Sequence, residues 1–136
     1  GCDICQDVCP WNRFAPDDTL PEFQHLPSMN PVDCRELLTL SAEQFETRFN
    51  NSPLSRPGRP GLLRNAAIVL GNAKDSSAEQ ELIAALNDTE TMIRGAAAWA
   101  LGQLGSPKAI AALRTRLSVE RDETVIQEID FVLRSH

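Results

Sequence analysis

Two pairs of short segments in this sequence resemble one another about thirty positions apart, and this repetition constrains the fold more than any other feature. Residues 64–67 have the sequence RNAA and residues 94–97 have RGAA, while ETMIR at 90–94 is matched by ETVIQ at 123–127. Apolar residues recur around these segments at helical spacing. Two-helix units of this period stack, and each buries its apolar face on the next. The sequence therefore predicts an all-α superhelix over residues 60–136.

Start and stop signals divide this region into five helices. They are expected to begin at residue 60 or 61, at a capping box over 77–80, at Thr89 or Thr91, at Pro107 and at Glu123. Gly71, Gly102 and Gly105 are expected to mark helix ends. The predicted core is aliphatic and comprises Leu63, Ala66, Ala67, Leu70, Leu82, Ile83, Leu86, Ile93, Ala96, Ala97, Leu101, Ile110, Leu113, Leu117, Val125, Ile126, Ile129 and Leu133. Because aromatic residues make up only 5% of the chain, close-packed helices fit better than a β-sandwich. The pattern resembles short HEAT-like repeats.

The chain before this region divides into two parts. In residues 41–59, a capping box from Ser41 to Gln44 predicts a helix through Phe49 with Phe45 and Phe49 buried, followed by a basic loop. In residues 1–40, five prolines favour irregular structure, with one short helix at 32–38. We expect these parts to be a connecting helix and loop, and a cysteine-containing segment with a proline-rich linker.

The cysteines near the start have the spacing of metal ligands. Cys2, Cys5 and Cys9, followed by Pro10, form C-x2-C-x3-C-P. Thiolates suit iron–sulfur clusters and zinc, and the proline after the last cysteine is typical of ferredoxin motifs, whose fourth cysteine serves a second cluster. We favour an iron–sulfur origin over a zinc knuckle or free cysteines. Three motif thiolates do not complete a four-cysteine site, so the chain alone is expected to hold no full cluster, and Cys34 to be a buried or idle thiol.

Charge and hydropathy limit the environment of the protein. A net charge of −6 argues against non-specific coating of nucleic acid but permits a local basic patch. No stretch approaches the roughly 18 apolar residues of a membrane helix, and no export signal precedes the cysteines. We expect a cytoplasmic monomer without membrane association and with reduced cysteines. Because the sequence begins at Gly1 inside a cysteine motif, we interpret it as a piece of a longer protein.

The basic patch is predicted at the start of the repeats. Arg56, Arg59 and Arg64 lie within nine residues, and Arg94 repeats the position of Arg64 one unit later. Guanidinium groups bind phosphates bidentately, and the side chain of Asn65 offers hydrogen bonds to a sugar or base edge. The alternative is that Arg64 and Arg94 join adjacent repeats through ion pairs with acidic residues.

Two motifs resemble a known family. GCDICQDVCPWN at residues 1–12 closely resembles the second cysteine motif of epoxyqueuosine reductases, and LLRNAAIVLGN at 62–72 resembles the opening of their C-terminal helical repeats. Phe45, Phe49, Ser52 and Arg56 also fall as that family would place them. The resemblance covers nearly the whole chain. It implies the C-terminal part of a cobalamin-dependent oxidoreductase that reduces epoxyqueuosine to queuosine at the wobble position of certain transfer RNAs.

The resemblance also implies roles for individual residues. Cys2 and Cys5 would ligate one [4Fe–4S] cluster together with upstream cysteines, and Cys9 would ligate another. The clusters would pass electrons to cobalamin in an upstream catalytic domain, so no catalytic residue is assigned here and this chain alone is expected to be inactive. The repeat domain would bind the transfer-RNA anticodon stem-loop through Arg56, Arg59, Arg64, Asn65 and Arg94.

Two other functions are also compatible with the sequence. One is a non-enzymatic helical-repeat scaffold that binds another protein, since such scaffolds serve many partners. The other is an electron-transfer iron–sulfur subunit for a different cobalamin enzyme. Trp11 and Trp99 are expected to be core or interface anchors rather than stacking platforms, because large aromatic side chains are commonly buried.

Overall fold

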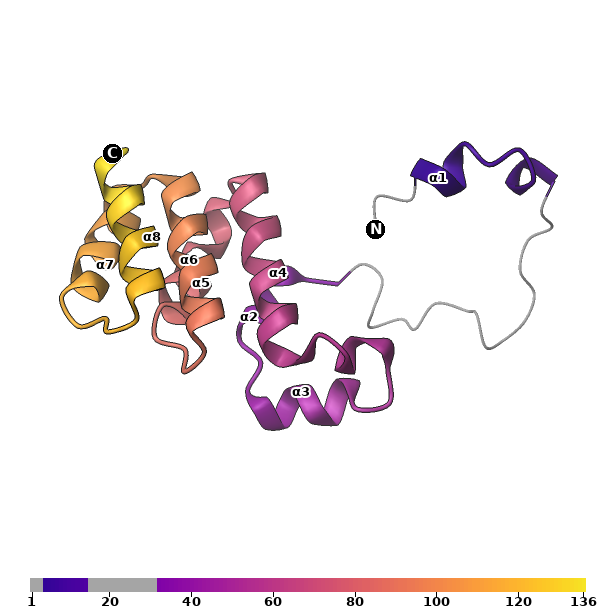
Figure 1. Cartoon of the computed structure of the whole chain (residues 1–136), viewed down its shortest axis with the longest axis horizontal. Coiled ribbons are helices and arrows are strands. Elements are labelled where there is room, and N and C mark those ends of the chain that lie inside the picture. The colour runs from indigo at the N-terminus through magenta and orange to yellow at the C-terminus, as the bar shows by residue number, and fades with distance from the viewer. Residues whose placement is uncertain (1–3, 15–31) are drawn as a thin grey trace. The chain divides into compact units, whose positions relative to one another are not determined.

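The computed structural model describes residues 4–14 and 32–136, and the chain divides into two units, residues 1–32 and 33–136 (Figure 1). The described part of the first unit contains one helical turn, α1 (Ile4–Asp7), and a 3-10 turn, η1 (Asn12–Phe14). A short helical turn thus lies in a segment that was expected to be irregular. Cys2 and most of the expected linker lie outside the described residues.

The second unit is built from helices. They are α2 (Cys34–Leu38), α3 (Ala42–Phe49), α4 (Gly58–Ala73), α5 (Glu79–Ala85), α6 (Thr91–Leu104), α7 (Pro107–Leu117) and α8 (Glu123–Arg134), with 3-10 turns η3 (Pro53–Ser55) and η4 (Ser76–Ala78). Figure 1 shows α4, α6 and α8 side by side in one layer with α5 and α7 behind them. The main packing contacts join α4 to α6 and α6 to α8 within that layer. The part of the chain that the structure describes contains no strand, which confirms the all-α prediction.

The predicted core is largely the observed one. The largest fully buried aliphatic side chains of the repeats are Leu63, Leu82, Ile93, Leu101, Leu113, Val125 and Ile129. Five residues that were predicted to be buried are only half-buried, at the margins of the layers: Ile83, Ile110, Leu117, Ile126 and Leu133. Phe45 and Phe49 are buried as predicted, with ring centroids 5.3 Å apart.

Two glycines that were expected to end helices instead allow helices to approach. A Cβ at Gly71 would lie 2.7 Å from Cζ3 of Trp99 and 2.9 Å from Cα of Ala100, so α4 and α6 meet there without a side chain between them. A Cβ at Gly102 would lie 2.7 Å from a methyl group of Val132 on α8. The helices continue past both glycines to Ala73 and Leu104, and the capping residues that follow, Lys74 and Gly105, have left-handed φ angles of 50° and 62°.

Helix starts follow the local capping groups. The predicted capping box is confirmed: Ser41 Oγ accepts from the Gln44 amide at 3.1 Å, and Gln44 accepts from the Ser41 amide at 2.8 Å. The second predicted capping box is wrong. Asp75 accepts from both the amide and the hydroxyl of Ser77, so η4 begins there and α5 begins at Glu79 without a side-chain cap.

The start of α4 also differs from the prediction. The helix begins at Gly58, so Arg59 lies in its first turn rather than in a loop. Pro107 does occupy the first turn of α7, where Ser106 caps the amide of Ala109 at 3.0 Å. None of the described helices is long and apolar enough to cross a membrane.

Candidate nucleic-acid interface

The cysteine segment offers an incomplete set of metal ligands. Cys5 lies on α1 and is exposed, and Cys9 follows the helix and is half-buried. The Asn12 side chain donates to the Gln6 carbonyl at 2.9 Å and closes the segment on itself. Residues 4–14 and 32–136 contain no group of three potential ligands close enough to hold a metal ion. The described residues alone therefore do not fit a complete [4Fe–4S] site.

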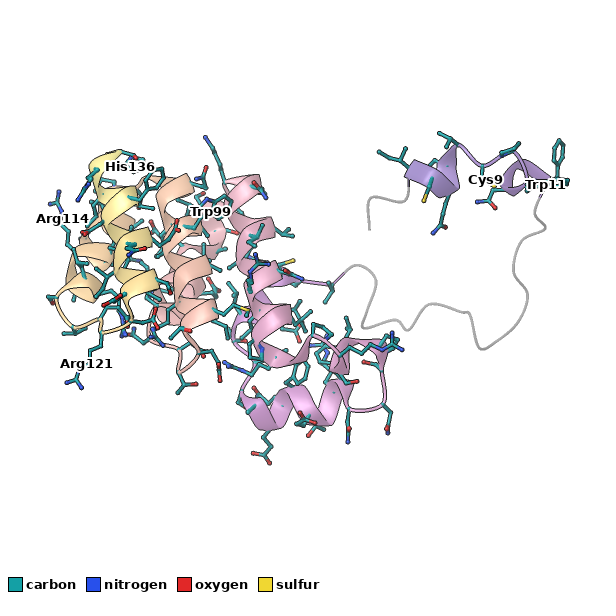
Figure 2. All side chains as sticks on the ribbon, in the orientation of Figure 1. Cys9, Trp11, Trp99, Arg114, Arg121 and His136 are labelled. Carbon is teal, nitrogen blue, oxygen red and sulfur yellow. The ribbon has the colours of Figure 1, made fainter. Side chains whose placement is uncertain are left out.

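Cys34, the cysteine outside the motif, and Trp11 have different environments. Cys34, at the start of α2, is half-buried, and burial together with the neighbouring Asp33 raises the pKa of its thiol. A raised pKa disfavours the thiolate that binds metal. Trp11 is 82% exposed within its segment, so it anchors no core among the described residues, and its role as an interface anchor stays a prediction (Figure 2).

Arg59 has an acidic partner inside the fold. Its Nε donates to the Leu40 carbonyl at 2.7 Å, and its two terminal nitrogens lie 3.2 and 2.5 Å from the carboxylate of Asp88, in the loop between α5 and α6. Burial raises the pKa of Asp88, but hydrogen bonds from Arg59 and the Glu90 amide outweigh it and hold that pKa below its usual value. Arg59 therefore joins the start of α4 to the next repeat.

Arg94 is more deeply engaged. It forms a bidentate ion pair with Glu120, with N–O distances of 2.8 and 2.9 Å, and the Glu120 side chain is only 1% exposed. Arg116 and the amides of Arg121 and Asp122 also donate to this carboxylate. The hydrogen bonds from Arg94 lead those that hold the pKa of Glu120 well below its usual value despite burial. The structure thus places Arg94 in the ion pair that the packing alternative expected.

Arg56, Arg64 and Asn65 have a different environment. All three side chains are exposed. Arg64 donates to the Asn65 side chain at 3.2 Å, and neither arginine has an acidic partner among the described residues. Arg56 lies just before α4 and Arg64 two turns into it. Of the five predicted RNA-binding residues, these three have side chains that an anion outside the fold can reach.

A groove opens beside Arg64 on the layer of α4, α6 and α8. Its volume is about 360 Å³, and its lining includes Arg64 and Asn72 from α4, Met92, Gly95 and Trp99 from α6, and Glu128 from α8. We call it the Trp99 groove. Figure 2 shows Trp99 on α6, next to α4. Trp99 was predicted to be a core or interface anchor; it is half-buried, packs against Gly71 of α4 and lines this groove. Trp99 follows Gly95 by one helical turn, so the sequence already indicated that these two residues lie on the same face of the helix.

Comparisons with known proteins agree with this architecture. A family profile for HEAT repeats matches residues 54–134. The epoxyqueuosine reductases of Bacillus subtilis and Listeria monocytogenes are 36% and 37% identical to this chain over 96% and 95% of its length, but the chain spans only 34% of each relative. A curated but uncharacterised protein of Geobacillus stearothermophilus is 35% identical over 95% of the chain, which spans 60% of it.

Solved structures give the same result. A crystal structure of epoxyqueuosine reductase with an epoxyqueuosine-modified tRNA-Tyr stem loop aligns with a TM-score of 0.89 and 35% identity, over 98% of this chain and 36% of the other. The enzyme from Streptococcus thermophilus aligns with a TM-score of 0.81 and 28% identity, over 99% of this chain and 36% of that one. The chain belongs to the HEAT-repeat family and is homologous, over nearly its whole length, to about a third of an epoxyqueuosine reductase.

Proposed function

We propose that this chain is the C-terminal part of an epoxyqueuosine reductase and that its repeat domain binds the anticodon stem-loop of the transfer RNA substrate. The observation that carries the proposal is the pair of exposed arginines at the start of the repeats, in a chain whose fold matches that of a reductase solved with a stem loop. Exposed guanidinium groups bind phosphates, and a few such contacts supply most of the salt-dependent affinity for RNA.

The five predicted RNA-binding residues divide into two roles in this proposal. Arg56, Arg64 and Asn65 contact the RNA, since their side chains are exposed and form no ion pair with a carboxylate among the described residues. Arg59 and Arg94 act indirectly: their pairs with Asp88 and Glu120 hold the loops that connect the repeats. Moving either arginine onto RNA would break an ion pair with a carboxylate that lies inside the fold, which is costly.

The cysteine segment has a separate place in the proposal. Cys2 and Cys5 contribute to one [4Fe–4S] cluster and Cys9 to a second, with the remaining ligands and the cobalamin supplied by an upstream catalytic domain. Soft thiolates with two-residue spacing support this assignment. When bound, such clusters supply electrons for reduction of the epoxide. The whole protein would be a monomeric oxidoreductase of transfer-RNA processing in the cytoplasm, where thiols stay reduced.

The binding proposal is tested by reversing the two exposed charges. The double variant Arg56→Glu and Arg64→Glu should bind a fluorescent anticodon stem-loop more weakly, and the slope of log affinity against log salt should fall by about 2. Arg114→Glu combined with Arg121→Glu is the matched control, because it reverses the same number of charges at two exposed arginines whose side chains point outward (Figure 2). Unchanged affinity and salt slope in the double variant would refute the proposal and favour a scaffold for a protein partner.

A further inference from the structure

The Trp99 groove has the dimensions of a small-ligand site. Its volume of about 360 Å³ lies within the roughly 300–1,000 Å³ typical of such sites. A Cβ built at Gly95 meets no atom within 4 Å, so the side of the groove formed by α6 is open at that position. The groove can therefore admit a flat group without any rearrangement of α6.

Trp99 gives the groove an aromatic surface in a defined position. The indole packs on the backbone of α4 at Gly71, where even one added carbon would lie 2.7 Å from Cζ3. The ring is only half-buried, so part of it remains available inside the groove. Met92 lies two turns earlier on the same helix face and is 52% exposed. A fixed, partly exposed indole is a platform on which an unpaired nucleobase stacks.

Two charged groups of opposite sign flank this surface. Arg64 comes from α4 and is exposed, and Glu128 comes from α8 and is half-buried. Among the described residues the Glu128 carboxylate has no hydrogen-bond or ion-pair partner. A guanidinium binds phosphate. A carboxylate only accepts hydrogen bonds, so it suits a base edge with two adjacent donors, and guanine, with N1–H and N2–H₂, is the common base that has them.

We infer that the Trp99 groove binds one unpaired guanosine of the RNA, with its base on Trp99, its Watson–Crick edge at Glu128 and its phosphate at Arg64. The inference rests on the proposed function, because the guanosine belongs to the RNA held by Arg56 and Arg64. A negatively charged peptide fits less well, since Glu128 would repel it. The groove would add base specificity to a surface that otherwise reads only phosphates.

The first experiment compares two stem-loops that differ by a single amino group. One carries an unpaired loop guanosine, and the other carries inosine there, which lacks the N2 donor. Anisotropy should show about tenfold weaker binding of the inosine stem-loop by the purified protein, the scale of one hydrogen bond to a charged group. Glu128→Gln should abolish the difference, because the amide no longer offers two acceptors to the base.

A second variant blocks the groove without removing any polar group. Gly95→Leu fills the open space and favours the helix, so it should weaken guanosine binding while the fold stays intact by circular dichroism. Ala111→Leu, on an exposed site of α7, is the control and should leave binding unchanged. Equal affinity for guanosine and inosine stem-loops, or full affinity in Gly95→Leu, would overturn the inference and leave the salt-dependent RNA binding in place.

The third arm is independent of the stem-loop. The chain has two tryptophans, so Trp11→Phe leaves Trp99 as the sole fluorophore. GMP should quench its fluorescence saturably and more strongly than AMP, and Gly95→Leu should remove this quenching. If no stem-loop binds, the proposed function fails, and the fluorescence titration alone tests whether the groove binds guanosine. Specific quenching by GMP would support the site, and equal quenching by GMP and AMP would overturn it.

Discussion

Arginines at equivalent positions of successive repeats have different environments in this protein. Arg94 is buried against Glu120, whereas Arg64, thirty positions earlier, is exposed. In the earlier repeat the loop is held by Arg59 and Asp88, and Asp88 also accepts from the Glu90 amide at 3.0 Å. In the later loop the Glu120 carboxylate likewise accepts hydrogen bonds from an arginine, Arg94, and from two backbone amides. Because Arg59 supplies the earlier pair, Arg64 remains available.

The Arg94–Glu120 pair should contribute strongly to stability. Glu120→Ala leaves the buried Arg94 without its carboxylate and removes an acceptor from Arg116, so the free energy of unfolding should fall by about 3–5 kcal/mol. Urea denaturation followed by circular dichroism measures the change. Glu123→Ala, at an exposed site in the first turn of α8, should cost less than about 1 kcal/mol. Similar losses in the two variants would contradict the role assigned to the pair.

The same carboxylate should make stability depend on pH in the acid range. Its folded-state pKa lies well below the ordinary 4.5, so the unfolded chain binds the proton more readily and protonation favours unfolding. The stabilisation is therefore complete above about pH 5 and is lost progressively as the pH falls below that. Asp88 and Asp122, whose pKa values are also lowered, act in the same direction. Glu120→Gln should show a shallower loss in urea titrations between about pH 5 and pH 3, and a slope equal to that of the unmodified protein would contradict this.

At the scale of helices, glycines control how closely the layer packs. Gly71→Ala should lower the free energy of unfolding by about 1–3 kcal/mol, because the new methyl group overlaps Trp99 and Ala100. Gly95→Ala, also in a helix but with open space around its Cβ, should raise it by up to about 1 kcal/mol. Thermal melts of the two variants give the comparison. Stabilisation by both substitutions would show that helix propensity, rather than contact between α4 and α6, governs these positions.

Helix boundaries were predictable where one local signal acted alone. Ser41 and Pro107 begin their helices as expected, since each acts through backbone groups within one turn. The prediction failed at Ser77, where Asp75 offers a competing acceptor two residues earlier. At Gly71 the helix ends close to the predicted position, two residues later at Ala73, although Gly71 itself lies against Trp99. The sequence does not distinguish a glycine that ends a helix from one that lets a neighbouring helix approach closely.

At the scale of the whole molecule, the number of ligands determines what this chain can hold. Three motif cysteines cannot complete a four-thiolate cluster, and the described residues contain no other suitable group. We therefore expect the 136-residue chain, purified alone under anaerobic conditions, to contain far less iron than the four atoms of one [4Fe–4S] cluster. Iron analysis with visible absorption measures this. Four irons per chain with a charge-transfer band would contradict the proposed division of ligands.

The sequence alone determined the helices, their repetition and the family of this protein. Helical periodicity and most caps act through residues within four positions of one another, and both family motifs are continuous segments. Only the tertiary structure decided which arginines are available and where Trp99 lies. Arg59 meets Asp88 and Arg94 meets Glu120 across 29 and 26 positions, and the Trp99 groove is assembled from three helices. Pairs and surfaces of this kind form only when the repeats stack, so their outcome depends on contacts between distant segments that the local pattern does not specify.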